Sequence, residues 1–168
     1  LGEGALDEMA AAIQKQGHGQ ALIVTDKTIL EVGLAARLKD ALDSCQLAST
    51  IFSEVHPNPL EQDCEEGIQC YMDNGCDSLI ALGGGSAMDV AKTLKILAGH
   101  PGPIAQYDEA KGGDRLILNP MPPLYAIPTT AGTGSEVGRA AVVILRETNR
   151  KTVFFHPQLM PTMAVLQP

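Results

Sequence analysis

Short apolar runs alternate with longer amphipathic segments along most of this chain. The longer segments repeat apolar residues every three or four positions, which predicts helices over residues 4–16, 28–45, 60–72 and 87–98. The short runs predict strands over residues 21–24, 49–55, 78–82 and 124–127. Because strands and helices alternate with short connections, the pattern predicts a parallel sheet with right-handed crossovers, flanked by helices.

The boundaries of these segments carry capping and turn residues. Thr28 and Glu31 have the spacing of a capping box, so the second helix is expected to begin at residue 28. Residues 99–123 are rich in glycine, proline and charge and predict a loop. Two further runs near the C-terminus predict the strands of a β-hairpin, at 140–145 and 152–155. A chain of 168 residues can bury one sizeable core, so we expect one Rossmann-like α/β domain over residues 1–168.

Three consecutive glycines, at 83–85, separate the third strand from the fourth helix. Backbone N–H groups at such a helix N-terminus are unobstructed and, with the helix dipole, form a site for a phosphate. The alternative is a tight turn without a ligand. In the helix that follows, the apolar face begins at Ala87. Four polar side chains are expected to point away from that face: Asp89, Lys92, Thr93 and Lys95.

A second polar segment, residues 129–136, follows the fourth strand and is rich in threonine and glycine. Its hydroxyls suit contacts to an anion or a ribose, and the alternative is a polar loop that caps a helix. Asp26 and Asn58 also lie just past predicted strands. The carboxyl ends of parallel strands share one edge of a sheet, so these groups and the glycine turn are expected to converge there.

Composition narrows the class of partner. The formal charge of −8 disfavours nucleic acids and anionic membranes, because no stripe of lysine and arginine is present to neutralise phosphates. No run approaches the roughly 18 apolar residues of a membrane span, and no leader pattern is seen at the N-terminus. We therefore expect a cytoplasmic protein with a small-molecule partner and no nucleic-acid or membrane partner; a homo-oligomer remains open.

The cysteines and histidines do not have the spacing of a metal site. No C-x-x-C pair occurs among the four cysteines, which are predicted to be free thiols. No two of the four histidines, His18, His56, His100 and His156, are spaced to share a helix face, and each is predicted to lie in a loop or at the surface. The standard P-loop, Rossmann G-x-G-x-x-G and G-x-S-x-G motifs are also missing.

Four ordered segments nevertheless resemble one family, the iron-containing alcohol dehydrogenases. They are Ala-Leu-Ile-Val-Thr-Asp-Lys at 21–27, Pro-Asn-Pro at 57–59, Gly-Gly-Gly-Ser-Ala-Met-Asp at 83–89 followed by Ala91-Lys92, and Pro-Thr-Thr-Ala-Gly-Thr-Gly-Ser-Glu at 128–136. The resemblance implies an N-terminal nucleotide-binding domain of the type shared with dehydroquinate synthase. It also implies the cofactor NAD and hydride transfer between a small alcohol and its aldehyde or ketone.

The resemblance carries cofactor-binding roles to eleven positions. Gly84, Gly85 and Ser86 match the pyrophosphate turn, and Thr129, Thr130 and Thr133 match contacts to the pyrophosphate, ribose and nicotinamide side. Asp26 matches the group that accepts the adenosine ribose hydroxyls, and an acid there suits NAD because it repels a 2′-phosphate. Further cofactor-lining positions correspond to Asn58, Asp89, Val142 and Lys151.

The family's metal site has no counterpart here. An aspartate and three histidines that hold a divalent metal, Fe²⁺ or Zn²⁺, belong to a helical domain expected beyond residue 168, so no catalytic or metal-binding residue is predicted in this chain, which is expected to be inactive alone. Two alternatives stay open: a relative of dehydroquinate synthase or of polyol-phosphate dehydrogenases, and a nucleotide-binding module without catalysis.

Overall fold

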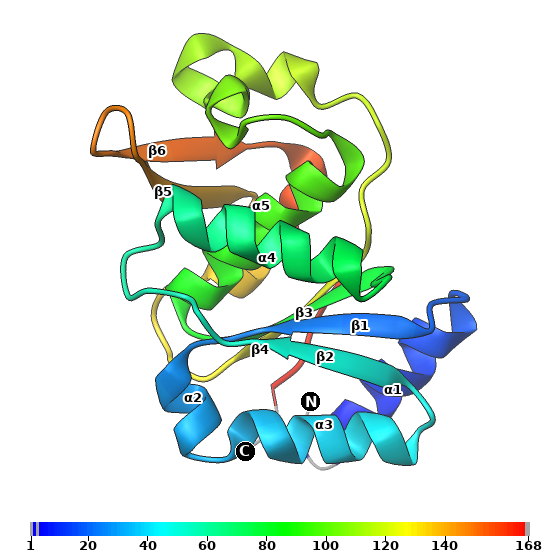
Figure 1. Cartoon of the computed structure of the whole chain (residues 1–168). Coiled ribbons are helices and arrows are strands. Elements are labelled where there is room, and N and C mark those ends of the chain that lie inside the picture. Colours follow the sequence, from blue (N-terminus) through cyan, green and yellow to red (C-terminus); the bar gives the residue numbers. More distant parts are fainter. Residues whose placement is uncertain (1, 3, 167–168) are drawn as a thin grey trace.

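The computed structural model describes residue 2 and residues 4–166. A five-stranded parallel sheet lies at its centre, in the order β2-β1-β3-β4-β7 (Figure 1). The strands are β1 (Gln20–Val24), β2 (Ala48–Phe52), β3 (Ser78–Gly83), β4 (Leu124–Pro128) and β7 (Met163–Ala164). The predicted parallel sheet is therefore confirmed. Its short edge strand β7 was not predicted, since two residues give no periodicity to detect.

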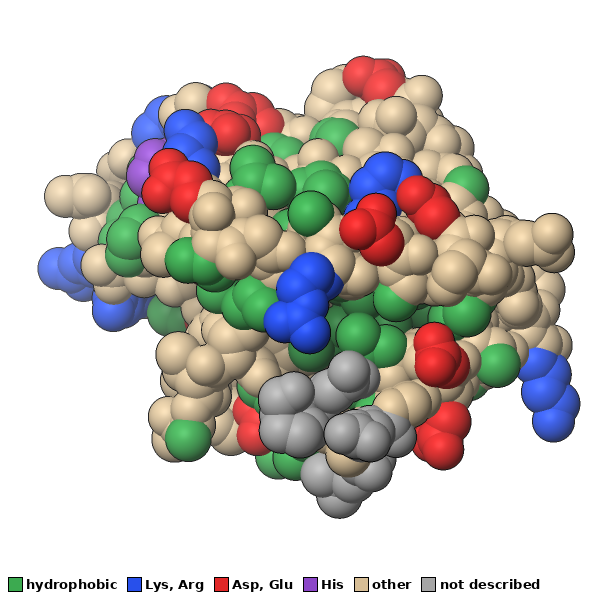
Figure 2. Space-filling view, turned by 90° about the horizontal axis from the view of Figure 1, so that it is seen from below, with side chains coloured by type: hydrophobic (Ala, Val, Ile, Leu, Met, Phe, Trp, Pro, Cys, Tyr) green, Lys and Arg blue, Asp and Glu red, His purple; other side chains and the backbone are tan. Residues whose placement is uncertain are grey.

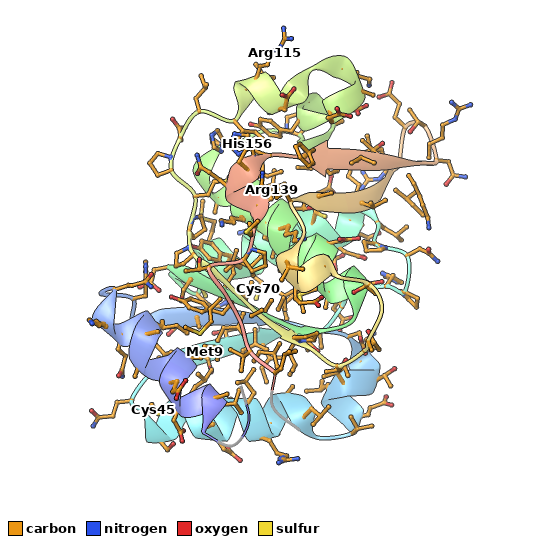
Figure 3. The ribbon with its side chains drawn as sticks, turned by 180° about the vertical axis from the view of Figure 1, so that it is seen from behind. Met9, Cys45, Cys70, Arg115, Arg139 and His156 are labelled. Carbon is orange, nitrogen blue, oxygen red and sulfur yellow. The ribbon has the colours of Figure 1, made fainter. Side chains whose placement is uncertain are left out.

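Helices cover both faces of the sheet (Figure 1). One face carries α1 (Ala5–Lys15), α2 (Lys27–Glu31) and α3 (Leu34–Ser44), and the other carries α4 (Glu61–Asp73) and α5 (Gly85–Gly99). Met9 of α1 is fully buried in the cluster between the first set of helices and the sheet (Figure 3). Strands β3 and β4 are apolar on both sides because each face of the sheet is covered.

A third layer lies over α5. The predicted hairpin forms from β5 (Ala140–Leu145) and β6 (Arg150–Phe155), which pair antiparallel. Its inward side chains pack with those of α5 in a separate cluster that includes Ile96, Ala141 and Phe154. Helix α5 is consequently enclosed between the sheet and the hairpin (Figure 1).

The enclosure of α5 corrects the amphipathic expectation for this helix. Lys92 and Thr93 are fully buried and Lys95 is only 6% exposed, although these polar residues were expected to point away from a single buried face. The cause is tertiary, because the covering strands come from residues about 50 positions later in the chain. Periodicity within α5 does not report them.

The second predicted helix is divided into α2 and α3 at Gly33, whose φ of +82° is left-handed. The predicted capping box at Thr28 is wrong. Asp26 caps α2 instead, with its Oδ1 accepting a hydrogen bond from the N–H of Ile29 at 3.0 Å.

The connection at 99–123 is more ordered than the expected loop. It contains three short 3₁₀ helices, Ile104–Tyr107, Glu109–Lys111 and Gly113–Leu116. His100, expected to lie in a loop or at the surface, begins this connection just after α5, but it is only 4% exposed. Its Nε2 accepts from the N–H of Asn119 at 2.7 Å, so Nδ1 carries the proton and donates to the carbonyl of Ile96.

The helices that the structure describes are all too short or too polar to cross a membrane. All four cysteines are free thiols, as predicted.

The buried ammonium of Lys95 yields a stability prediction. Burial, and then the nearby charge of Lys92, lowers the Lys95 pKa to about 8. Among the residues that the structure describes, its one hydrogen-bond acceptor is the Met160 carbonyl at 3.4 Å. Between this pKa and the unfolded value of 10.5, the unfolded chain holds more protons, so stability should rise with pH. Lys95→Met should raise the free energy of unfolding at pH 7 by about 1–3 kcal/mol and flatten that rise.

Urea unfolding of both proteins from pH 7 to 10 measures this effect. Lys39→Met, at an exposed helical pair with Asp43, is the control and should change the unfolding free energy by less than about 0.5 kcal/mol. A constant difference between wild type and Lys95→Met across this pH range would contradict the assignment.

Candidate functional site

The turn between β3 and α5 requires glycine at position 83 and is closely approached by a side chain at position 84. Gly83 has a φ of +150°, and a Cβ placed on it would lie 2.9 Å from the Cβ of Ala87. A Cβ on Gly84, the N-cap of α5, would lie 2.9 Å from Oγ1 of Thr130. The backbone of the turn and the threonine-rich loop at residues 129–136, called the threonine loop below, therefore approach closely. The first N–H groups of the 15-residue helix α5 lie at this edge of the sheet.

The threonine loop runs beside this turn. The N–H of Thr129 donates to the carbonyl of Gly83 at 3.0 Å, which ties the start of the loop to the end of β3. Farther along, Cγ2 of Thr133 would be 3.4 Å from a Cβ on Gly85. All three predicted threonines, Thr129, Thr130 and Thr133, are exposed, so their hydroxyls are accessible to a ligand.

Lys92 fixes the far end of the threonine loop to α5. Its ammonium donates to the carbonyl of Ser135 at 2.7 Å, to Oγ of the same residue at 3.2 Å, and to the carbonyl of Ala140 at 3.0 Å. Burial lowers the Lys92 pKa, while the nearby Asp89 and Glu136 carboxylates raise it. Three acceptors satisfy the three donors of the ammonium, so one buried charge joins the glycine-turn helix, the loop and β5.

Asp89 lies one turn before Lys92 and faces the groove. Burial raises its pKa to about 6, against the opposing effect of the Lys92 charge. Its Oδ1 accepts from Oγ of Ser135 at 3.5 Å. This carboxyl therefore changes charge near neutral pH at the side of the turn.

Asp26 lies at the end of β1, on the other side of the turn. Its Oδ1 is engaged with the N–H of Ile29, and its Oδ2 lies toward β3, 3.7 Å from the position of a Cβ on Gly83. Among the residues that the structure describes, no hydrogen bond is formed by Oδ2. One oxygen thus holds α2 while the other remains an acceptor beside the glycine turn.

The segment that carries Asn58 is held by a carboxylate that the sequence analysis did not identify. Asp63 is 1% exposed and accepts hydrogen bonds from the backbone N–H groups of His56 and Leu60, at 3.1 and 3.0 Å. Its other oxygen lies 2.7 Å from Nδ1 of His56. From the opposite side, Oγ of Ser86 donates to the carbonyl of Pro57 at 2.6 Å.

These segments enclose a groove along the carboxyl edge of the sheet. Two adjoining hollows of about 480 and 190 Å³ make up the groove, and both are lined by Pro57 and Ser86. Of the predicted site residues, the larger hollow is lined by Asp26, Ser86, Thr129 and Thr130. The smaller is lined by Asn58, Gly85, Ser86, Asp89, Val142 and Lys151. Gly84 and Thr133 lie beside the groove, so the predicted convergence is confirmed.

Another hollow, of about 350 Å³, opens on the side of the first three helices and differs in character. Its walls include Leu6, Leu34, Leu38, Leu82 and Ile127. Figure 2 shows hydrophobic side chains among charged ones on this side of the molecule. The groove offers many more hydroxyl, carboxylate and backbone N–H groups, so it is the better candidate for a polar ligand.

Sequence reasoning missed several residues that shape the groove. The signals for Lys92 and Asp63 were weak: a lysine three positions after Asp89, and an acid at the third position of a helix. Lys27 and Glu54 also line the larger hollow and form an ion pair of 2.7 Å. Only the tertiary structure shows that they meet.

Across the described part of the chain, no three or more histidine, cysteine, aspartate and glutamate side chains are grouped to hold a metal ion. The donor set of this groove instead suits an organic ligand with phosphate and hydroxyl groups.

Comparison with known proteins gives consistent matches. A family profile described as "Iron-containing alcohol dehydrogenase" matches residues 1–168. The chain is 40% identical to 4-hydroxybutyrate dehydrogenase of Cupriavidus necator over 98% of its own length, and 35% identical to lactaldehyde reductase of Escherichia coli K12 over 99%. It spans only 42% and 43% of those two relatives.

Solved structures show the same correspondence. An alcohol dehydrogenase from Oenococcus oeni matches with a TM-score of 0.90 and 31% identity, over all of this chain and 43% of that one. A sulfoacetaldehyde reductase from Bifidobacterium kashiwanohense, solved in complex with NAD⁺, matches with a TM-score of 0.88 and 31% identity, over the same shares.

The threonine-loop anchor gives a prediction for Lys92→Met. The substitution leaves the Ser135 and Ala140 carbonyls without their charged donor, so the free energy of unfolding should fall by about 2–3 kcal/mol. Amide hydrogen exchange should also speed up over residues 133–140. Urea unfolding and exchange measured by mass spectrometry test both effects, with Lys39→Met as control. Unchanged exchange in the loop would show that Lys92 does not hold it.

Proposed function

Because this chain belongs to the iron-containing alcohol dehydrogenase family, we propose that its groove binds NAD(H) for hydride transfer between a small alcohol and its aldehyde or ketone. One observation carries the proposal: the N-terminus of α5 opens into the groove at Gly85 and Ser86, at a turn of glycines that carries no side chains in front of its N–H groups. Such a helix end stabilises a pyrophosphate through its N–H groups and dipole. The NAD⁺ complex of the related reductase supports this choice of ligand.

The groove supplies a group for each part of the dinucleotide. In the proposed arrangement, the pyrophosphate lies at Gly84, Gly85 and Ser86, and the threonines at 129, 130 and 133 donate to it and to the neighbouring ribose. Oδ2 of Asp26 accepts from the adenosine ribose hydroxyls. Toward the hairpin, the remaining lining residues are Asn58, Asp89, Val142 and Lys151.

This chain offers groups for binding the cofactor, and its described residues offer no group of ligands for a metal ion. The family name implies iron, which supplies a Lewis acid to the alcohol oxygen when it is bound. The residues described here offer no group of ligands for it, so we assign no step of the reaction to a metal held by this chain. Its own residues bind the cofactor and orient the nicotinamide. We propose that the metal-binding helical domain belongs to a longer protein, since the chain spans 42% and 43% of two relatives.

The same proposal extends to the class of substrate and to the cellular compartment. The substrate class is a small alcohol or aldehyde, as the names of the relatives indicate for those proteins. The four free thiols support a reducing compartment such as the cytoplasm.

Gly85→Val tests the glycine turn. The first residue of α5 would then carry a side chain where the pyrophosphate must approach, so the dissociation constant for NADH should rise about tenfold or more. The nearest contact of the new Cβ is Thr133 at 3.4 Å, which a folded protein tolerates. Calorimetric titration measures affinity, and circular dichroism verifies folding.

Gly19→Val is the matched control for this variant. Gly19 precedes β1, at the opposite edge of the sheet, and a Cβ there meets nothing within 4 Å. NADH affinity should stay at its wild-type value in this control. If a folded Gly85→Val protein bound NADH as tightly as the wild type, the proposed pyrophosphate site would be wrong.

Asp26→Asn tests the cofactor preference. The amide keeps the Oδ1 cap on Ile29 but removes the charge that repels a 2′-phosphate. The wild type should bind NADH more tightly than NADPH, and the variant should reduce that preference by about tenfold. Titration of both proteins with both cofactors decides this, and equal wild-type affinities for the two would contradict the role of Asp26.

A further inference from the structure

The larger hollow of the groove has an ion pair on its wall that joins two neighbouring strands. Val24 of β1 and Phe52 of β2 are register partners, and the N–H of Thr25 donates to the Phe52 carbonyl at 2.9 Å. Just beyond this last strand contact, Nζ of Lys27 lies 2.7 Å from Oε2 of Glu54. Figure 1 shows α2, which begins at Lys27, beside the end of β2.

Both members of the pair are charged and accessible at neutral pH. The hydrogen bond from Lys27 lowers the pKa of Glu54, and the same pairing raises the pKa of Lys27. Their side chains are 66% and 47% exposed. A second contact helps to orient the acid, because Oγ of Ser53 donates to Oε1 of Glu54 at 3.4 Å. Because both side chains are exposed, the pair adds little to the free energy of unfolding, and both charges lie on the wall of the hollow.

Lys27 supplies the positive charge on the wall of the larger hollow. Of the described residues that line this hollow, it is the one lysine or arginine, and it directly follows Asp26 in the chain. His56, also on the wall, is engaged with the buried Asp63 carboxylate. A phosphate at the Asp26 end would therefore depend on Lys27 for a full positive charge.

We infer that Glu54 is a specificity-determining residue, because it engages Lys27 and withholds the hollow's cation from the 2′-phosphate of NADPH. This inference rests on the proposed function and extends it beyond Asp26. A cofactor with two free ribose hydroxyls needs only an acceptor, which Oδ2 of Asp26 provides. A 2′-phosphate beside Asp26 meets the carboxylates of Asp26 and Glu54. The charge of Lys27, the one cation among the described residues of this wall that could bind the phosphate, is already neutralised by Glu54.

The decisive experiment is a double-mutant cycle on the ratio of the NADPH and NADH dissociation constants, measured by calorimetry at low ionic strength. Glu54→Gln should lower the ratio about fivefold, because Lys27 becomes available to the phosphate. Lys27→Met should raise it about threefold, because Glu54 is left unpaired. In the double variant, Glu54→Gln should have less than half of its effect, since no lysine remains to be released.

A remote ion pair gives the matched control. Lys39 and Asp43 on α3 form an exposed pair of 3.1 Å that does not line the hollow, and Asp43→Asn should leave the ratio unchanged. If Glu54→Gln lowers the ratio equally with and without Lys27, or does not lower it, the inference is wrong. A wild-type chain that binds neither cofactor would instead contradict the proposed function. Binding of NADH with an unaltered ratio in Glu54→Gln would contradict the inference alone.

Discussion

The buried ammonium of Lys92 is the interaction on which the geometry of the groove depends. A charge without solvent needs its full complement of acceptors, and these come from Ser135 and Ala140, more than 40 positions away. Meeting this requirement fixes the end of the threonine loop and the start of β5 against α5. The same helix begins at the glycine turn, so the turn and the loop keep one relative position.

Lys95, three positions further along α5, shows the contrast. It is nearly as buried as Lys92, but within the described part of the chain it has a single long hydrogen bond, and its pKa is lowered to about 8. Burial of a lysine in α5 is therefore costly wherever acceptors are few. The cost is offset at Lys92 because the loop supplies two acceptors and β5 supplies a third. Lys92 therefore shapes the site, whereas Lys95 only occupies the interior.

Charge along the groove changes with position. The end formed by β1 and β2 carries Asp26 and the Lys27–Glu54 pair, whereas the glycine turn presents backbone N–H groups and hydroxyls. Asp89 adds a carboxyl whose pKa of about 6 lets its charge vary near neutral pH. An anion is thus favoured at the turn, while an uncharged diol is favoured at the acidic end. This asymmetry suits a dinucleotide bound in one direction.

The sequence by itself determined the parallel α/β fold and the hairpin, because local periodicity reports them. The shared edge of parallel strands was enough to bring together Asp26, Asn58, the glycine turn and residues 129–136. Asp89, Val142 and Lys151 were predicted from the family resemblance, since no periodicity places them beside the turn. The sequence did not determine the burial of Lys92, Lys95 and His100, nor the clamp of Asp63. The burial of the two lysines and of His100 depends on segments packed over α5 and its end, which come from later in the chain. Asp63 binds the nearby His56 and Leu60, and its only local signal is its place as the third residue of a helix. The pairing of Lys27 with Glu54 was likewise decided by the tertiary structure, because the parallel pairing of β1 with β2 brings the segments beyond their ends together.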